Sequence, residues 1–168
     1  MNEGDLDALL HGWRGGRRTV PLADFDYHGA IVVVEMTTDE IVFVHPGANT
    51  ENEPASLPAS PCPPSESPRD CAVRIVREMT GLEVTIGGEF TTFIQEGTPT
   101  GTMYIHGYLA RPTGGILAAS GADGPVSRHR VSDLPPLIPV RAAVRRVLDA
   151  YLDLHNSAER RGGDHGDS

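Results

Sequence analysis

The sequence predicts an α/β or α+β sandwich, in which one helix divides a series of strands and a second helix closes the chain. Short apolar and β-branched runs lie on both sides of a segment with helical periodicity, and another helical pattern follows the last of them. A chain of 168 residues suits one domain. We expect an N-terminal extension with a short helix at 1–16, the domain at 17–155 and a disordered tail at 156–168.

The strands are predicted from composition and alternation. Gly29–Met36 is almost wholly apolar and β-branched, which is typical of a strand buried on both faces. Ile41–His45 follows a turn and is expected to be its hairpin partner. A Gly- and Ala-rich stretch at 112–125 is expected to be mobile. The remaining strands are expected at Arg17–Leu22, at Leu82–Ile86 with Glu89–Gln95 as its continuation past Gly87 and Gly88, at Thr102–Ala110 and at Val126–Ser132.

The central helix has start and stop signals. Ser67 is a strong N-cap, Pro68 suits the first helical position, and Gly81 supplies a left-handed stop. Its apolar side chains form one stripe, made of Cys71, Ala72, Ile75, Val76 and Met79. A second amphipathic helix is predicted to open at Pro139.

Composition excludes several classes of function. The formal net charge of −9 argues against wholesale nucleic-acid binding. All 14 basic residues are Arg, so Schiff-base and P-loop lysine chemistry is absent. No apolar run is long enough to span a bilayer, and no signal peptide is evident, so we expect a cytoplasmic protein. In a reducing cytosol Cys62 and Cys71 are expected to be free thiols, Cys71 in the core and Cys62 exposed.

The segment Leu57–Val84, LPASPCPPSESPRDCAVRIVREMTGLEV, resembles the signature box of the Nudix (MutT-like) hydrolase superfamily. The family pattern is Gly, five residues, Glu, seven residues, Arg-Glu-apolar-x-Glu-Glu, one residue, Gly-apolar. The element order across Tyr27–Leu152 also resembles the family's. The resemblance implies an α/β/α sandwich with a mixed sheet, a box helix and a C-terminal helix. It also implies hydrolysis of a nucleoside diphosphate linked to another moiety, with Mg²⁺ or Mn²⁺ as cofactor. The positions that fit are Glu66, Arg74, Val76, Glu78, Gly81 and Leu82.

The departures from this pattern fall on the residues that would hold metal. Ile75 and Met79 replace two of the three glutamates, which share a helix face at i, i+3 and i+4, and Ser60 replaces the glycine. Apolar side chains do not bind Mg²⁺, which prefers several oxygen ligands. Prolines in the preceding loop stiffen a segment where the family has glycines. The box is therefore predicted to be degenerate.

The surviving box residues, Glu66, Arg74 and Glu78, are the remnants of the catalytic set. We expect a structural Glu66–Arg74 pair and a surface ladder of Asp70, Arg74 and Glu78. If the chain is active, Glu78 and Glu96 are the candidate metal ligands. Weaker substitutes are Glu35 and Glu53 for a carboxylate, and Asp123 or His129 for a base.

Two functions are weighed on this basis. The first is a weak or non-catalytic module that binds a nucleotide-like ligand or a protein partner. The alternative is a Mg²⁺- or Mn²⁺-dependent hydrolase with a rearranged site. Aromatic side chains can stack on a base and Arg can bind phosphate. The main candidate contacts are Tyr104, Tyr108, Arg111 and Arg128, with His106 and Arg130 beside them. A homodimer is a further expectation from the family.

Overall fold

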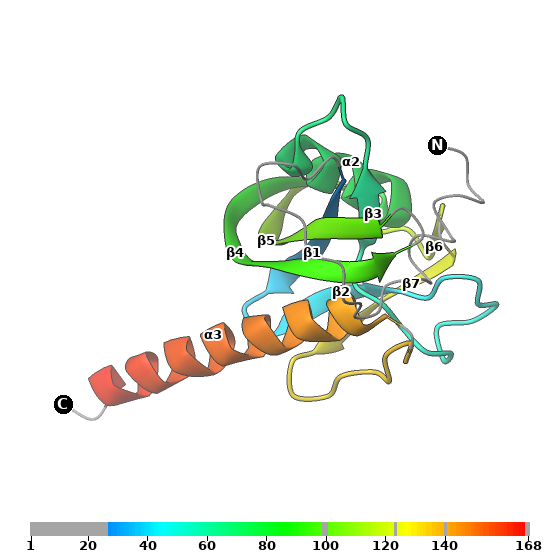
Figure 1. Ribbon diagram of the computed structural model, residues 1–168. Helices are drawn as coiled ribbons and strands as arrows, with labels where there is room; N and C mark the ends of the chain where they lie inside the picture. Colours follow the sequence, from blue (N-terminus) through cyan, green and yellow to red (C-terminus); the bar gives the residue numbers. More distant parts are fainter. Residues whose placement is uncertain (1–26, 99–100, 123, 140, 167–168) are drawn as a thin grey trace.

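The computed structural model describes residues 27–98, 101–122, 124–139 and 141–166. The helix expected within 1–16 and the strand expected at 17–22 lie outside these ranges. Seven strands and two helices are found in the described residues (Figure 1). They are β1 (His28–Thr37), β2 (Glu40–Val44), β3 (Ala59–Cys62), α2 (Pro68–Thr80), β4 (Leu82–Thr98), β5 (Gly101–Gly115), β6 (Ser120–Gly121), β7 (Gly124–Arg130) and α3 (Ala142–Gly166).

The sheet is mixed and is organised around β1. One edge of β1 pairs in parallel with β5, from His28 opposite Tyr104 to Val34 opposite Ala110. Its other edge pairs antiparallel with β3 at the start of the strand and with β2 at the end. The strand order is β4-β5-β1-β2-β7-β6, with β3 attached to β1. Because β1 has neighbours along both edges, its continuous apolar sequence is buried throughout Gly29–Val34.

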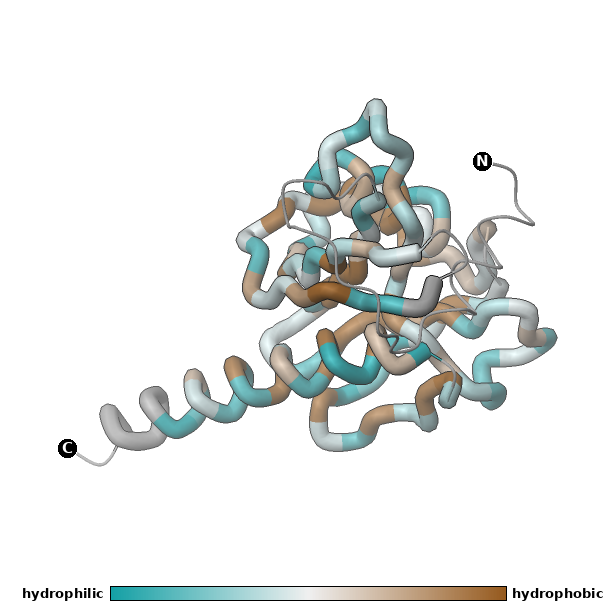
Figure 2. Tube along the Cα trace, in the orientation of Figure 1, coloured by the Kyte–Doolittle hydropathy of each residue, from teal (hydrophilic) through white to brown (hydrophobic). Residues whose placement is uncertain are grey.

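The two helices cover opposite faces of this sheet and complete the predicted α/β/α sandwich (Figure 1). Alternate side chains of β1 point to opposite faces. Ala30, Val32 and Val34 pack with the stripe of α2, whereas Ile31 and Val33 pack with the apolar side of α3. Apolar segments are concentrated where these layers meet, and polar segments lie on the outside (Figure 2).

Several elements differ from the sequence prediction in extent. β4 continues past Gly87 and Gly88 as expected, because irregularities in its pairing with β5 absorb them, and it extends further, to Thr98. β5 continues to Gly115, and β6 follows it, within the stretch expected to be mobile. The residues of α3 begin at Ala142 rather than at Pro139.

Helix α3 continues to Gly166, past Asn156, where a disordered tail was expected to begin. Its C-terminal part extends beyond the sheet (Figure 1). Nε2 of His155 lies 3.9 Å from a Glu159 carboxylate oxygen at i, i+4, an interaction that supports the helix. In the described residues, no helix is both long enough and apolar enough to cross a membrane.

Candidate functional site

Helix α2 carries the box residues, and its ends are fixed as the sequence predicts. The Ser67 hydroxyl accepts a hydrogen bond of 3.1 Å from the backbone N–H of Asp70. Pro68 occupies the first turn, and Gly81 ends the helix with a left-handed φ of 81°. These caps fix the register of the helix, and the register decides which box side chains face the sheet.

Arg74 is the centre of the polar face of α2. Its Nε donates to both Glu66 carboxylate oxygens, at 3.1 and 3.0 Å, and its Nη1 donates to Glu78 Oε2 at 3.0 Å. Hydrogen bonding to Glu66 raises the pKa of Arg74. Asp70, expected as a further rung, instead contributes its backbone N–H to the N-cap. The surviving polar box residues therefore bind one another.

The positions where the family has its other two carboxylates face the sheet. Ile75 is 1% exposed and Met79 is 6% exposed, and both belong to the apolar cluster beneath α2. Ala30, Val32 and Val42 of the sheet lie in the same cluster. An ionised carboxylate at either position would be removed from water without a partner, at a cost of several kcal/mol.

The segment 116–122 covers the C-terminal end of α2. The N–H of Ala118 donates to Thr80 O at 2.8 Å, and the N–H of Ala122 donates to Glu78 O at 3.0 Å. Gly121 approaches so closely that a Cβ on it would lie 1.9 Å from the carbonyl oxygen of Met79. The Gly- and Ala-rich composition of this segment, expected to give mobility, instead allows it to pack directly on the helix backbone.

A disulfide that the sequence prediction missed joins β3 to α2. Cys62, at the end of β3, is bonded to Cys71 of α2, with Cα atoms 5.8 Å apart. Free thiols were therefore the wrong prediction, and so was an exposed Cys62, because it is only 4% exposed. Ser60, which replaces the family's glycine, is also buried in β3 and its hydroxyl donates to Pro61 O. This segment is a strand tied to the helix, not an open loop.

Among the comparisons with known proteins, the solved structures identify the fold. No family model and no curated protein matches the sequence. Among solved structures, an ADP-ribose pyrophosphatase from Streptococcus suis matches with 20% identity and a TM-score of 0.54, over 77% of this chain and 91% of that chain. The chain has the Nudix fold. A UDP-X diphosphatase matches with 14% identity and a TM-score of 0.59, over 82% of this chain and 66% of that one. The E. coli ORF135 protein matches with 19% identity and a TM-score of 0.56, over 82% and 97%.

The residues at the Nudix box do not fit Mg²⁺ or Mn²⁺. Such an ion needs several oxygen ligands that converge. Glu78 lies on α2 and is paired with Arg74, whereas Glu96 lies on β4. Glu35 accepts a hydrogen bond from Tyr151, and the Glu53 carboxylate accepts the N–H groups of its own loop. Within the described ranges, none of these carboxylates belongs to a group of three that could hold an ion.

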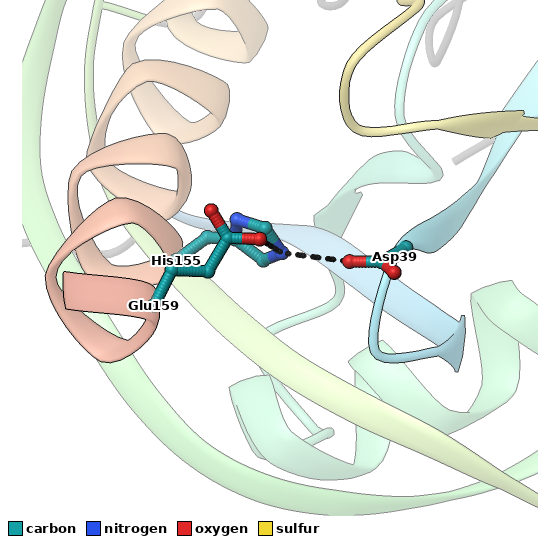
Figure 3. Close-up of side chains that lie close together, drawn as sticks. All are labelled: Asp39, His155 and Glu159. Carbon is teal, nitrogen blue, oxygen red and sulfur yellow. Dashed lines mark ion pairs between the residues drawn. The ribbon is translucent and has the colours of Figure 1, made fainter. Parts of the chain in front are cut away.

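A different group, Asp39, His155 and Glu159, has its potential ligand atoms within 4.8 Å of one another (Figure 3). Nε2 of His155 lies 3.6 Å from Asp39 Oδ1 and 3.9 Å from Glu159 Oε1. The same nitrogen is 3.0 Å from the carbonyl oxygen of Thr38. A carbonyl only accepts, so Nε2 carries a proton and has no lone pair for a metal. In this geometry the group ties α3 to the turn between β1 and β2.

The four predicted ligand contacts lie in three different places. Tyr104 and Tyr108 lie on the α2 face of β5, in a cluster of rings with His28 and His106. His28 Nδ1 is 2.9 Å from His106 Nε2, and His106 Nδ1 is 3.1 Å from a Glu89 oxygen. Burial lowers the pKa of His106 and raises that of Tyr108 to about 12. These rings are held mainly by one another.

Arg111 lies on the opposite face and lines a cavity of about 550 Å³ between β5 and α3. Its guanidinium is 74% exposed and is 3.6 Å from Glu35. Leu109, Tyr151 and Leu154 form apolar walls of this cavity. Of the four predicted contacts, Arg111 combines an accessible cation with a cavity of the size that ligands occupy.

Arg128 lies on β7, where its guanidinium is paired with Glu40, and it lines a separate pocket of about 410 Å³. Beside it, His129 lies 3.0 Å from the hydroxyl of Ser127, and burial and the nearby His45 lower its pKa. Asp123, the alternative base, lies outside the described residues. Sequence reasoning missed His45 and Ser127, because nothing local shows that residues 82 positions apart meet.

Proposed function

We propose that this chain is a Nudix-fold protein that does not hydrolyse nucleoside diphosphates at its box and instead binds a nucleotide-like ligand. The observation that carries the proposal is the burial of Ile75 and Met79, which put apolar side chains where the family's chemistry needs carboxylates. Glu78 alone is a weak ligand for a hard cation, and its carboxylate is already bound to Arg74.

The ligand-binding part of the proposal is supported by the cavity at Arg111. Leu109, Tyr151, Leu154 and Ala158 give it apolar walls, and Arg111 offers an exposed cation at its rim beside the carboxylates of Glu35, Asp39 and Glu159. The apolar walls suit a ring system, and Arg111 is the group that would bind its phosphate. The two pyrophosphate-cleaving enzymes of the same fold, whose names specify ADP-ribose and a UDP derivative, make nucleoside diphosphate compounds the first ligands to test.

Hydrolysis is tested with purified protein, a set of nucleoside diphosphate derivatives that includes ADP-ribose and UDP-sugars, and Mg²⁺ or Mn²⁺. Phosphate-containing products are measured by chromatography. We expect no turnover above a buffer blank. Turnover that is lost in Glu78→Gln, but kept in the exposed control Glu83→Gln, would overturn the proposal.

Binding is tested by calorimetry with the same compounds and no metal. We expect Arg111→Ala to weaken binding at least tenfold, because the phosphate loses its cation, which corresponds to about 1.4 kcal/mol. Arg145→Ala is the matched control, since Arg145 is also mostly exposed, lies on α3 and is paired only with Asp149 in the described structure. Equal losses in the two variants would show that the ligand does not use the cavity.

A further inference from the structure

A polar network that the proposed function does not use lies at the outer end of the sheet. His45 follows β2 directly and is fully buried, and Ser127 and His129 lie two residues apart on β7 and so share a face. The Ser127 Oγ is 2.6 Å from His45 Nε2 and 3.0 Å from His129 Nε2. His45 Nδ1 is 2.7 Å from the backbone oxygen of Glu53.

The positions of the protons in this network follow from which atoms can donate a hydrogen bond and which can only accept one. The carbonyl of Glu53 only accepts, so Nδ1 of His45 must carry a proton and donate it. A neutral imidazole whose proton lies on Nδ1 has a lone pair on Nε2, which faces the Ser127 hydroxyl. The Ser127 hydroxyl therefore donates to Nε2 of His45. Its one proton is then used, so His129 Nε2–H donates to the Ser127 oxygen.

This arrangement is the one that activates a serine. A histidine accepts the serine proton, and a backbone oxygen on its other nitrogen holds the ring in the required tautomer. A nucleophile must also be reachable by its substrate. Here Ser127, Arg128 and His129 line the pocket of about 410 Å³, whose other walls come from Leu117–Ala119 and from Glu51 and Asn52.

We propose that Ser127 is a nucleophile that takes the acyl group of small activated carboxylic esters, with His45 as its general base. Oγ attacks the ester carbonyl carbon while its proton passes to Nε2 of His45. The tetrahedral intermediate expels the alcohol, which takes that proton, and the acyl group remains on Ser127 as an ester. Water, deprotonated by the same nitrogen, then releases the carboxylic acid and restores the hydroxyl. This reaction needs no metal and is independent of the Nudix box.

The test is incubation of the full chain with 4-nitrophenyl acetate, with 4-nitrophenolate release followed by absorbance and the acetylated residue located by peptide mass spectrometry. We expect an acetyl group on Ser127 that is absent in Ser127→Ala and kept in Ser132→Ala, a control for an exposed serine just after β7. His45→Gln is expected to slow acylation by about 100-fold, the lower range for loss of a general base. Acetylation confined to other residues, with 4-nitrophenolate release unchanged in Ser127→Ala, would overturn the proposal.

A second measurement does not depend on an ester fitting the pocket. A thiol at the same position reports whether the network accepts a proton, because a neighbouring histidine lowers the pKa of a thiol. We expect the new thiol in Ser127→Cys to react with iodoacetamide at a pH at least about one unit below that needed by Ser132→Cys. The native cysteines are joined to each other and do not compete. Identical pH profiles for the two variants would show that the network is structural only, and would also overturn the proposal.

Discussion

Two regions of the sheet differ in polarity: the contact beneath the box stripe of α2 is apolar, whereas the outer end of β2 and β7 holds a polar network. Under α2, where the Nudix fold elsewhere carries carboxylates, the contact is apolar and the remaining charged groups pair on the surface. At the end of β2 and β7, two histidines and a serine are largely buried beside a pocket. A buried polar group costs free energy unless it is hydrogen-bonded, and here Ser127 is hydrogen-bonded to both histidines. Family resemblance identifies the first region, whereas the hydrogen-bonded serine and histidines of the second are seen only in the structure.

The largest test of this difference places carboxylates where the family has them. Ile75→Glu with Met79→Glu is expected to lower the free energy of unfolding by more than about 4 kcal/mol, because two charges enter an apolar cluster. Urea denaturation measures the change, and Val73→Glu on the exposed side of α2 is the control. A midpoint for the double variant that equals the control's would show that this face is open to water. A midpoint that Mn²⁺ raises in the double variant but not in the wild type would indicate an ancestral metal site.

The disulfide joins the segment before α2 covalently to the helix. Cys62→Ala with Cys71→Ala is expected to cost about 2 to 3 kcal/mol, since the bond closes a loop of nine residues in the unfolded chain. Urea unfolding of wild type with and without dithiothreitol gives the same comparison without mutation. If the reductant leaves the wild-type midpoint unchanged, the bond does not form in solution.

The two histidine clusters predict a pH dependence. The pKa values of His106 and His129 are lowered, chiefly by burial, so the unfolded chain binds more protons than the folded one below about pH 6.5. The free energy of unfolding should therefore fall as the pH decreases through that range. For each residue, the slope against pH should be smaller than the slope that the uptake of one full proton would give. His106→Gln and His129→Gln should each flatten the slope of unfolding free energy against pH. A slope that neither variant changes would assign the effect to other groups.

The smallest expected effect is on the surface of α2. Glu78→Gln should change the free energy of unfolding by less than about 0.5 kcal/mol, because the side chain is 50% exposed and water screens its pair with Arg74. Glu66→Gln should cost more, since Glu66 receives several hydrogen bonds from Arg74 and is less exposed. Thermal melts at low and high salt separate the two. A larger effect at Glu78 would give that carboxylate a role beyond the surface pair.

Local signals predicted the scaffold, and long-range contacts limited what could be said about the sites. The ends of α2 follow from Ser67, Pro68 and Gly81, and the burial of β1 follows from its continuous apolar run, because each depends on neighbouring residues. Burial of Ile75 and Met79 follows from the same helical period. The disulfide did not follow, since sequence spacing does not tell whether two Cα atoms lie 5.8 Å apart.

The candidate serine shows the same limit more strongly. Ser127 and His45 meet only because β2 and β7 pair, with Val44 opposite Val126. The packing of the segment 116–122 on α2 was also missed, because a Gly- and Ala-rich composition indicates both mobility and close backbone contact. In each case the deciding fact is which strands and helices become neighbours.

The pairing of β1 also sets an order on folding during synthesis. Each residue of β1 that pairs with β5 has its partner 76 positions later in the chain, as His28 has Tyr104. At about 5 to 20 residues per second, ribosomes need about 4 to 15 s to make that interval. During this time β1, the most apolar strand of the protein, can pair with β2 and β3, but the edge that will pair with β5 stays unpaired. Nascent chains are therefore exposed to aggregation and to chaperones for several seconds, through a strand that is fully enclosed in the finished fold.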